Sequence, residues 1–289
     1  MISPLSVLVG VGVILAVTGF AYLAMDRAAV KMIRPPLKPI RRRADDLPFF
    51  SRSISIPSGA QELSGWVVEP KEDNGGPVLV LVHGWGSNHG TVARLAEPLL
   101  GMGYPVVLFD VRHHGESGKA PFVTARHFRD DILATVKRSR GLFPGRALVL
   151  IGHSMGGSTG VLAALKDPLL RGFISIAAPA NLWGVWAYQL NQKGLPGWAI
   201  VKGLSYFLRR RAGEPWDALD PLKLAPDLRL PFMVLHGGKD QSVPVEQAFL
   251  LAGAAGVRPW IIPDWGHTDV LESPELHEVL GKVLKGLTG

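Results

Sequence analysis

A serine set among glycines is the feature of this sequence best suited to covalent chemistry. Residues 152–157 read Gly-His-Ser-Met-Gly-Gly, after an apolar branched run at 147–151 and before a helical pattern at 158–166. The apolar run is typical of a strand buried on both faces, so Ser154 is expected on a sharp strand-to-helix turn. Such a turn strains the serine backbone and leaves no room for side chains at the flanking glycines. It also places the hydroxyl at the end of a strand, with a helix N-terminus behind it that favours negative charge.

A serine becomes a nucleophile when a base accepts its proton and an acid orients the base. In a parallel sheet both partners must come from loops at the carboxyl ends of strands. Two such loops occur: Asp240 follows an apolar strand pattern at 232–235, and His267 follows another at 259–262. The order Ser154, Asp240, His267 therefore predicts a catalytic triad of nucleophile, orienting acid and base.

Other residues compete for these roles. Asp264 lies three residues before His267, and Asp110 follows the strand pattern at 106–109, so both are alternatives to Asp240. Asp110 can also hydrogen-bond its own turn, and Ser154 can cap a helix. Three more histidines flank glycine turns and are expected to be structural: His83, His153 and His236.

The composition of the chain excludes several classes of function. The chain has 289 residues, 47% of them apolar and 19% charged, which is typical of a folded protein with a large core. It has no cysteine, which excludes disulfides, thiolate catalysis and cysteine zinc sites. Residues 1–43 hold seven of the 31 basic residues and one of the 24 acidic ones, so the remainder is almost neutral. A short basic segment beside a neutral domain does not indicate nucleic-acid binding.

The N-terminus resembles a membrane anchor. Residues 2–25 carry no charge and are long enough, as a helix, to cross a hydrocarbon layer of roughly 30 Å. A cleaved signal peptide is the alternative, but no basic residue precedes the apolar run and the basic residues follow it. We expect an anchor at 1–25, a basic proline-rich linker at 26–44, and a cytoplasmic domain by the positive-inside rule.

From residue 45 the pattern alternates between strands and helices. A strand hairpin is expected at 50–69, and further strands at 78–82 and 173–176 join those already named, with helices between them. This alternation predicts a mostly parallel, doubly wound sheet covered on both faces. Residues 180–226 interrupt it with aromatic, short helical pieces and are expected to form a small cap.

The chain from about residue 45 to 289 resembles the α/β-hydrolase superfamily. The resemblance rests on motifs that lie at the ends of successive strands. Within the superfamily, the chain resembles the bacterial esterase/lipase-like group, which includes monoacylglycerol-lipase-like and serine-aminopeptidase-like members. This finer resemblance rests on the hairpin motif at 63–66 and on the short cap. His113 departs from the family, which usually has glycine there. The resemblance implies an oxyanion hole formed by the backbone N–H groups of Met155 and Trp85. The motifs in chain order are His83-Gly-Trp-Gly86, Asp110-Val-Arg-His-His-Gly-Glu-Ser117, Gly152-His-Ser-Met-Gly-Gly157, His236-Gly-Gly-Lys-Asp240 and Gly266-His267.

We therefore expect a membrane-anchored serine hydrolase that cleaves a small-molecule carboxylic ester, with no metal and no cofactor. The tether and the aromatic cap suggest an acyl chain or a lipid-derived ester. Thioester or small-peptide hydrolysis by the same triad stays open, as does a non-catalytic, membrane-tethered binding module. A serine at the turn argues against relatives with a carboxylate nucleophile, and the sequence has no Ser-x-x-Lys, phosphate-loop or His-Glu-x-x-His pattern.

Overall fold

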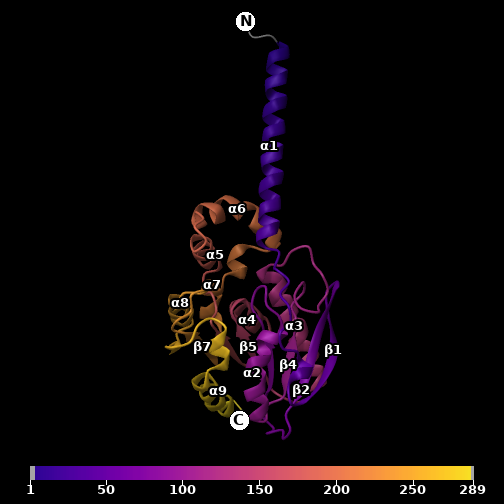
Figure 1. The fold of residues 1–289 in the computed structure, drawn as a ribbon, viewed down its shortest axis with the longest axis vertical. Coiled ribbons are helices and arrows are strands. Elements are labelled where there is room, and N and C mark those ends of the chain that lie inside the picture. The colour runs from indigo at the N-terminus through magenta and orange to yellow at the C-terminus, as the bar shows by residue number, and fades with distance from the viewer. Residues whose placement is uncertain (1–3, 288–289) are drawn as a thin grey trace.

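The computed structural model describes residues 4–287, in which one long helix projects from an α/β body (Figure 1). Residues 1–3 of the expected anchor and 288–289 of the expected hydrolase domain lie outside the described residues. Helix α1 (Pro4–Met32) runs away from the body, and the C-terminus lies at the opposite end of the molecule.

All eight strands expected from the sequence are present and form one sheet. The order is β1-β2-β4-β3-β5-β6-β7-β8, with β1–β2 and β2–β4 antiparallel and the other pairs parallel. The mostly parallel, doubly wound sheet is therefore confirmed. The strands are β1 (Phe50–Ser58), β2 (Gln61–Glu69), β3 (Val78–Val82), β4 (Val106–Phe109), β5 (Leu148–His153), β6 (Leu170–Ile176), β7 (Phe232–Gly237) and β8 (Trp260–Ile262).

Helices cover both faces of the sheet because the central strands are apolar on both sides; every residue of β3, β4 and β5 is buried. Apolar side chains of α3 (Ala125–Leu142), α4 (Met155–Lys166) and α8 (Glu246–Ala254) pack into the core on one face. Those of α2 (His89–Gly101) and α9 (Pro274–Gly286) pack on the other. Because these strands are parallel, their carboxyl ends lie together at one edge of the sheet.

The segment expected as a cap is helical: α5 (Leu182–Asn191), α6 (Gly197–Ala212) and α7 (Pro221–Leu224). Helix α6 lies beside the base of α1 (Figure 1). Ala29 of α1 and Ile33 just after it pack with Leu204, Phe207 and Leu208 of α6 in a separate apolar cluster.

Helix α1 continues through residues 26–32, beyond the apolar segment. Among residues 4–287 it is the one helix long and apolar enough to cross a membrane, and its most apolar window has a mean hydropathy of 2.3 with none of it buried in the protein. Thus α1 does not serve as a core helix of the body.

Candidate active site

Ser154 occupies the turn between β5 and α4 with φ +56° and ψ −123°. A non-glycine residue rarely adopts positive φ, and such strain costs on the order of 1–3 kcal/mol. The Ser154 N–H donates to the Ile176 carbonyl at 2.8 Å and helps to hold the turn. A Cβ at Gly152 would collide with the Gly156 backbone, and one at Gly156 would lie 2.7 Å from the Val82 carbonyl, which confirms the requirement for both glycines.

The structure brings Ser154, His267 and Asp240 into one chain of hydrogen bonds. His267 Nε2 lies 3.0 Å from Ser154 Oγ, and His267 Nδ1 lies 2.7 Å from Asp240 Oδ2. The loops that carry His267 and Asp240 follow β8 and β7 and pack backbone against backbone: the Lys239 N–H donates to the Trp265 carbonyl at 2.9 Å. This packing sets the distance between acid and base.

The surroundings of Asp240 keep it ionised. Burial alone would raise the pKa of its carboxyl, but the partners His236 and His267 and the backbone N–H of Val243 outweigh that cost, so the pKa lies well below its usual range. Its Oδ1 accepts the N–H groups of Ser242 and Val243, both at 2.8 Å. The remaining oxygen faces His267, so a negative charge is available to stabilise an imidazolium.

Neither alternative acid approaches His267. Asp110 is buried and accepts hydrogen bonds from the His89 N–H and ring and from the Glu116 N–H of its own turn. Asp264 points to solvent, where its carboxylate pairs with Lys239 Nζ at 2.8 Å.

The histidines beside the glycine turns are held by the backbone. His83 Nδ1 lies 2.8 Å from the Gly84 carbonyl, and its Nε2 accepts the Val111 N–H. Burial lowers the pKa of His153 to about 3, so its ring is neutral and its Nε2–H donates to the His267 carbonyl at 2.7 Å. His153 therefore braces the loop that carries His267, a contact over 114 positions that no local pattern reveals.

The backbone N–H groups of Trp85 and Met155 flank the serine without other partners among the described residues. Met155 opens α4, where backbone N–H groups are free and the helix dipole favours negative charge. Gly84 makes the approach of the Trp85 loop possible, because a Cβ at this position would lie 2.8 Å from Ser154 Cβ and 3.1 Å from Ser154 Oγ. The arrangement can hold an oxyanion beside the serine.

We expect Gly84→Ala to reduce kcat for an ester by about 10²–10³-fold, the size of effect that losing one oxyanion donor produces. The added methyl displaces either Ser154 or the Trp85 loop. Gly101→Ala is the matched control, since a Cβ there has nothing within 4 Å. Equal kcat values for the two variants in a p-nitrophenyl acetate assay would contradict this role.

His113 has φ +59°, a left-handed conformation that glycine adopts without strain. Its N–H donates to the Gly118 carbonyl at 2.8 Å and its Nδ1 accepts the Ala120 N–H at 3.1 Å. These bonds hold the loop after β4 with His113 in the left-handed conformation.

A groove of about 370 Å³ opens beside Ser154. Gly84, Trp85, His153 and His267 line it together with residues of the linker, Lys38, Pro39 and Arg41. The sequence predicted this segment only as a linker between anchor and domain, so its place in the groove wall is a feature that the sequence pattern missed.

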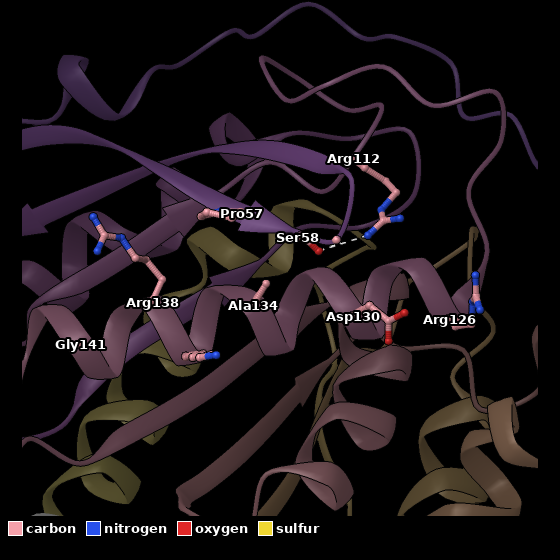
Figure 2. Close-up of a pocket in the computed structure, with 10 residues that line it drawn as sticks. Pro57, Ser58, Arg112, Arg126, Asp130, Ala134, Arg138 and Gly141 are labelled. Carbon is pink, nitrogen blue, oxygen red and sulfur yellow. Dashed lines mark hydrogen bonds between the residues drawn. The ribbon is translucent and has the colours of Figure 1, made fainter.

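A larger cavity, of about 690 Å³, lies elsewhere, along α3 and the end of β1 (Figure 2). Its basic side chains do not converge: Figure 2 shows Arg126 and Arg138 at opposite ends of the cavity. Arg112 is bound to Asp131 and Ser58. No serine–histidine pair lines this cavity among the described residues, so it does not compete with the groove as a reaction site.

Comparisons with known proteins agree with the fold. A family model described as the alpha/beta hydrolase fold matches residues 77–200. The human monoglyceride lipase is 28% identical over 207 residues, covering 60% of this chain and 68% of that protein. The Bacillus subtilis protein YqkD is 26% identical over 195 residues, 66% of this chain, but the match spans only 63% of YqkD's length. The Pyrococcus furiosus esterase Pf2001 superposes with a TM-score of 0.73 at 23% identity, over 89% of this chain and 99% of that one.

The sheet order, the serine turn and these matches together define the class. The chain has the α/β-hydrolase fold, and its residues 77–200 match the family model of that fold.

Proposed function

We propose that this protein is a membrane-anchored serine hydrolase that cleaves carboxylic esters through a Ser154–His267–Asp240 triad. The observation that carries the proposal is the unbroken hydrogen-bond chain from the Ser154 hydroxyl through His267 to the ionised Asp240. The similarity to a protein named monoglyceride lipase and to an esterase fold supports an ester as the substrate.

The geometry accounts for each proton in the reaction. Ser154 Oγ attacks the ester carbonyl carbon as its proton passes to His267 Nε2, and the Trp85 and Met155 N–H groups bind the resulting oxyanion. The C–O bond to the alcohol then breaks, and His267 returns the proton to the departing oxygen. Water next gives a proton to His267 and attacks the acyl-enzyme, which releases the acid and restores the serine hydroxyl.

The site that we propose for the acyl group is an apolar cavity under the cap. A small cavity of about 20 Å³ is lined mainly by apolar side chains, among them Trp85, Met155, Trp186 and Trp216. Other cap aromatics pack on each other, as Trp183 and Trp216 do with ring centroids 4.3 Å apart. A long acyl chain would therefore have to shift the cap away from Met155.

The test is hydrolysis of p-nitrophenyl esters of increasing chain length by the detergent-solubilised full chain. Turnover of esters, with thioester and peptide analogues slower, supports the proposal. Faster cleavage of thioesters or small peptides would assign the same triad to the alternative acyl transfers. No turnover of any acyl substrate would favour the binding module.

We further propose that α1 remains as an anchor with the hydrolase domain in the cytoplasm. The basic residues follow the apolar segment, as the positive-inside rule requires for a cytoplasmic domain. Asp26, within the same helix, forms an ion pair with Arg211 of α6 at 2.6 Å. Cleavage of a signal sequence would remove an integral, packed part of the fold.

The contact between α1 and α6 supports a position of the cap at the membrane surface. Tyr22 lies inside the uncharged segment, and its ring is 5.0 Å from that of Phe207 in α6. Trp198 and Tyr206 of α6 are 57% and 61% exposed, and Lys202 and Arg209 are exposed beside them. Aromatic residues favour the membrane interface, and cations favour anionic head groups.

This arrangement predicts which positions contact lipid. Because the chain has no cysteine, one introduced thiol can be labelled specifically with an environment-sensitive dye. In proteoliposomes, brominated lipids should quench dyes at Ile14→Cys and Trp198→Cys by at least about half, because both sites adjoin acyl chains or the interface. Leu169→Cys, an exposed leucine on the body, should be unaffected. Equal quenching at Leu169 and Trp198 would contradict the placement.

A further inference from the structure

The groove beside Ser154 has a basic wall formed largely by the linker. Lys38, Arg41 and Arg94 line it, and none of the described residues lining it is an Asp or Glu. The linker is fastened there: Asn88 Nδ2 donates to the Lys38 carbonyl at 3.2 Å and to the Pro39 carbonyl at 3.4 Å. Lys38 and Arg41 are therefore held beside the reaction site by a segment that would otherwise only connect the anchor to the domain.

Two of these cations have no partner among the described residues. Arg94 binds Glu272 at 3.1 Å, while the linker residues Arg42 and Arg43 bind Glu97 and Glu116. Within residues 4–287, Lys38 and Arg41 have neither an ion pair nor a side-chain hydrogen bond. A cleft with charge of one sign concentrates ligands of the opposite sign.

The base that protonates the departing alcohol lies in the same groove as the basic wall. His267, which must protonate that alcohol, lines the groove together with Thr268. The apolar cavity under the cap shares Trp85 with the groove but is lined by apolar side chains such as Leu182 and Leu208. An ester bound at Ser154 thus places its acyl part under the cap and its alcohol part among the cations.

We propose that the substrate is an ester whose alcohol portion carries an anionic group, a carboxylate or a phosphate, bound by Lys38 and Arg41. This inference rests on the proposed ester hydrolysis and specifies its substrate class. The anion does not change charge during the reaction, so the two cations bind ground state and transition state alike. Their effect should therefore appear in KM more than in kcat.

The experiment compares two butyrate esters that differ only in the alcohol: 4-nitrophenyl butyrate and 3-carboxy-4-nitrophenyl butyrate, in detergent at low salt. We expect wild type to show a KM about tenfold lower for the carboxylate ester, an advantage that falls with added salt because the cations are exposed. In Lys38→Ala/Arg41→Ala the KM values for the charged and the neutral ester become equal. Arg27→Ala/Lys31→Ala, which removes two exposed cations of α1, is the charge-matched control and keeps the advantage.

A second pair, butyrylated glycerol and butyrylated glycerol phosphate, tests a phosphate in place of the carboxylate. In each pair the KM advantage is that of the charged ester over its neutral partner, and the pair with the greater advantage identifies the anion that the groove favours. Equal KM values for charged and neutral esters in both pairs, or an advantage that survives in Lys38→Ala/Arg41→Ala, overturn the proposal. If wild type cleaves none of the four esters, ester hydrolysis itself fails. Calorimetric titration with 5-hydroxy-2-nitrobenzoate and with glycerol phosphate then decides the anion site: binding lost in the double variant supports it, and no binding overturns it.

Discussion

Ser154→Ala should lower kcat for ester hydrolysis by at least about 10⁴-fold and abolish labelling by a fluorophosphonate. The Ser154 hydroxyl is the group 3.0 Å from His267 Nε2, and without it no acyl-enzyme forms. The backbone donors at Trp85 and Met155 stay in place, so slow residual turnover through bound water is compatible with this result. Alanine meets the same backbone strain at φ +56° that serine does, so the fold should be retained.

Fluorophosphonate labelling followed by mass spectrometry checks this directly, since the phosphonylated peptide identifies the nucleophile. Ser53→Ala, on the exposed face of the edge strand β1, should label and turn over like wild type. A Ser154→Ala protein that is still labelled would move the nucleophile to another side chain, and an unlabelled wild type would favour a binding module.

The fold was predictable because its strongest signals are local. The central strands are short apolar runs, and each is followed by glycine or polar residues that end it, as at Val82 and Phe109. Parallel strands end at one edge, so the loops after β5, β7 and β8 had to meet there, which brought Ser154, Asp240 and His267 together. The prediction of Asp240 over Asp264 as the acid depended on the resemblance and on chain order. In the structure the two carboxylates differ in burial, since Asp240 is buried and Asp264 is exposed.

The linker and the end of α1 could not be placed in this way. A basic, proline-rich stretch is typical of an exposed spacer, and its contacts with Asn88 lie about fifty residues away in sequence. Likewise, the helical continuation through residues 26–32 depends on packing against α6, which buries Ala29 of α1 and Ile33 just after it. Both features arise from tertiary packing, which periodicity does not encode.

Asp240→Asn is expected to lower kcat by about 10⁴-fold at neutral pH with little change in fold. The amide oxygen can keep the Ser242 and Val243 N–H bonds that Oδ1 accepts now, which turns the NH₂ group towards His267. His267 Nδ1 must then accept, so its proton moves to Nε2, the atom that has to take the serine proton. In this variant His267 is present but in the wrong tautomer. A large loss of kcat with an intact fold would therefore show that Asp240 orients and charges the base and does not only support the loop.

Steady-state kinetics and the rate of fluorophosphonate labelling should fall together in Asp240→Asn, because both need the same deprotonation of Ser154. Asp264→Asn is the matched control: its exposed carboxylate pairs only with Lys239 among its described neighbours, so kcat should stay within about twofold of wild type. If Asp264→Asn instead caused the larger loss, the acid of the triad would be Asp264. The loop after β8 would then have to turn inward on substrate binding, since in this structure that carboxylate faces solvent.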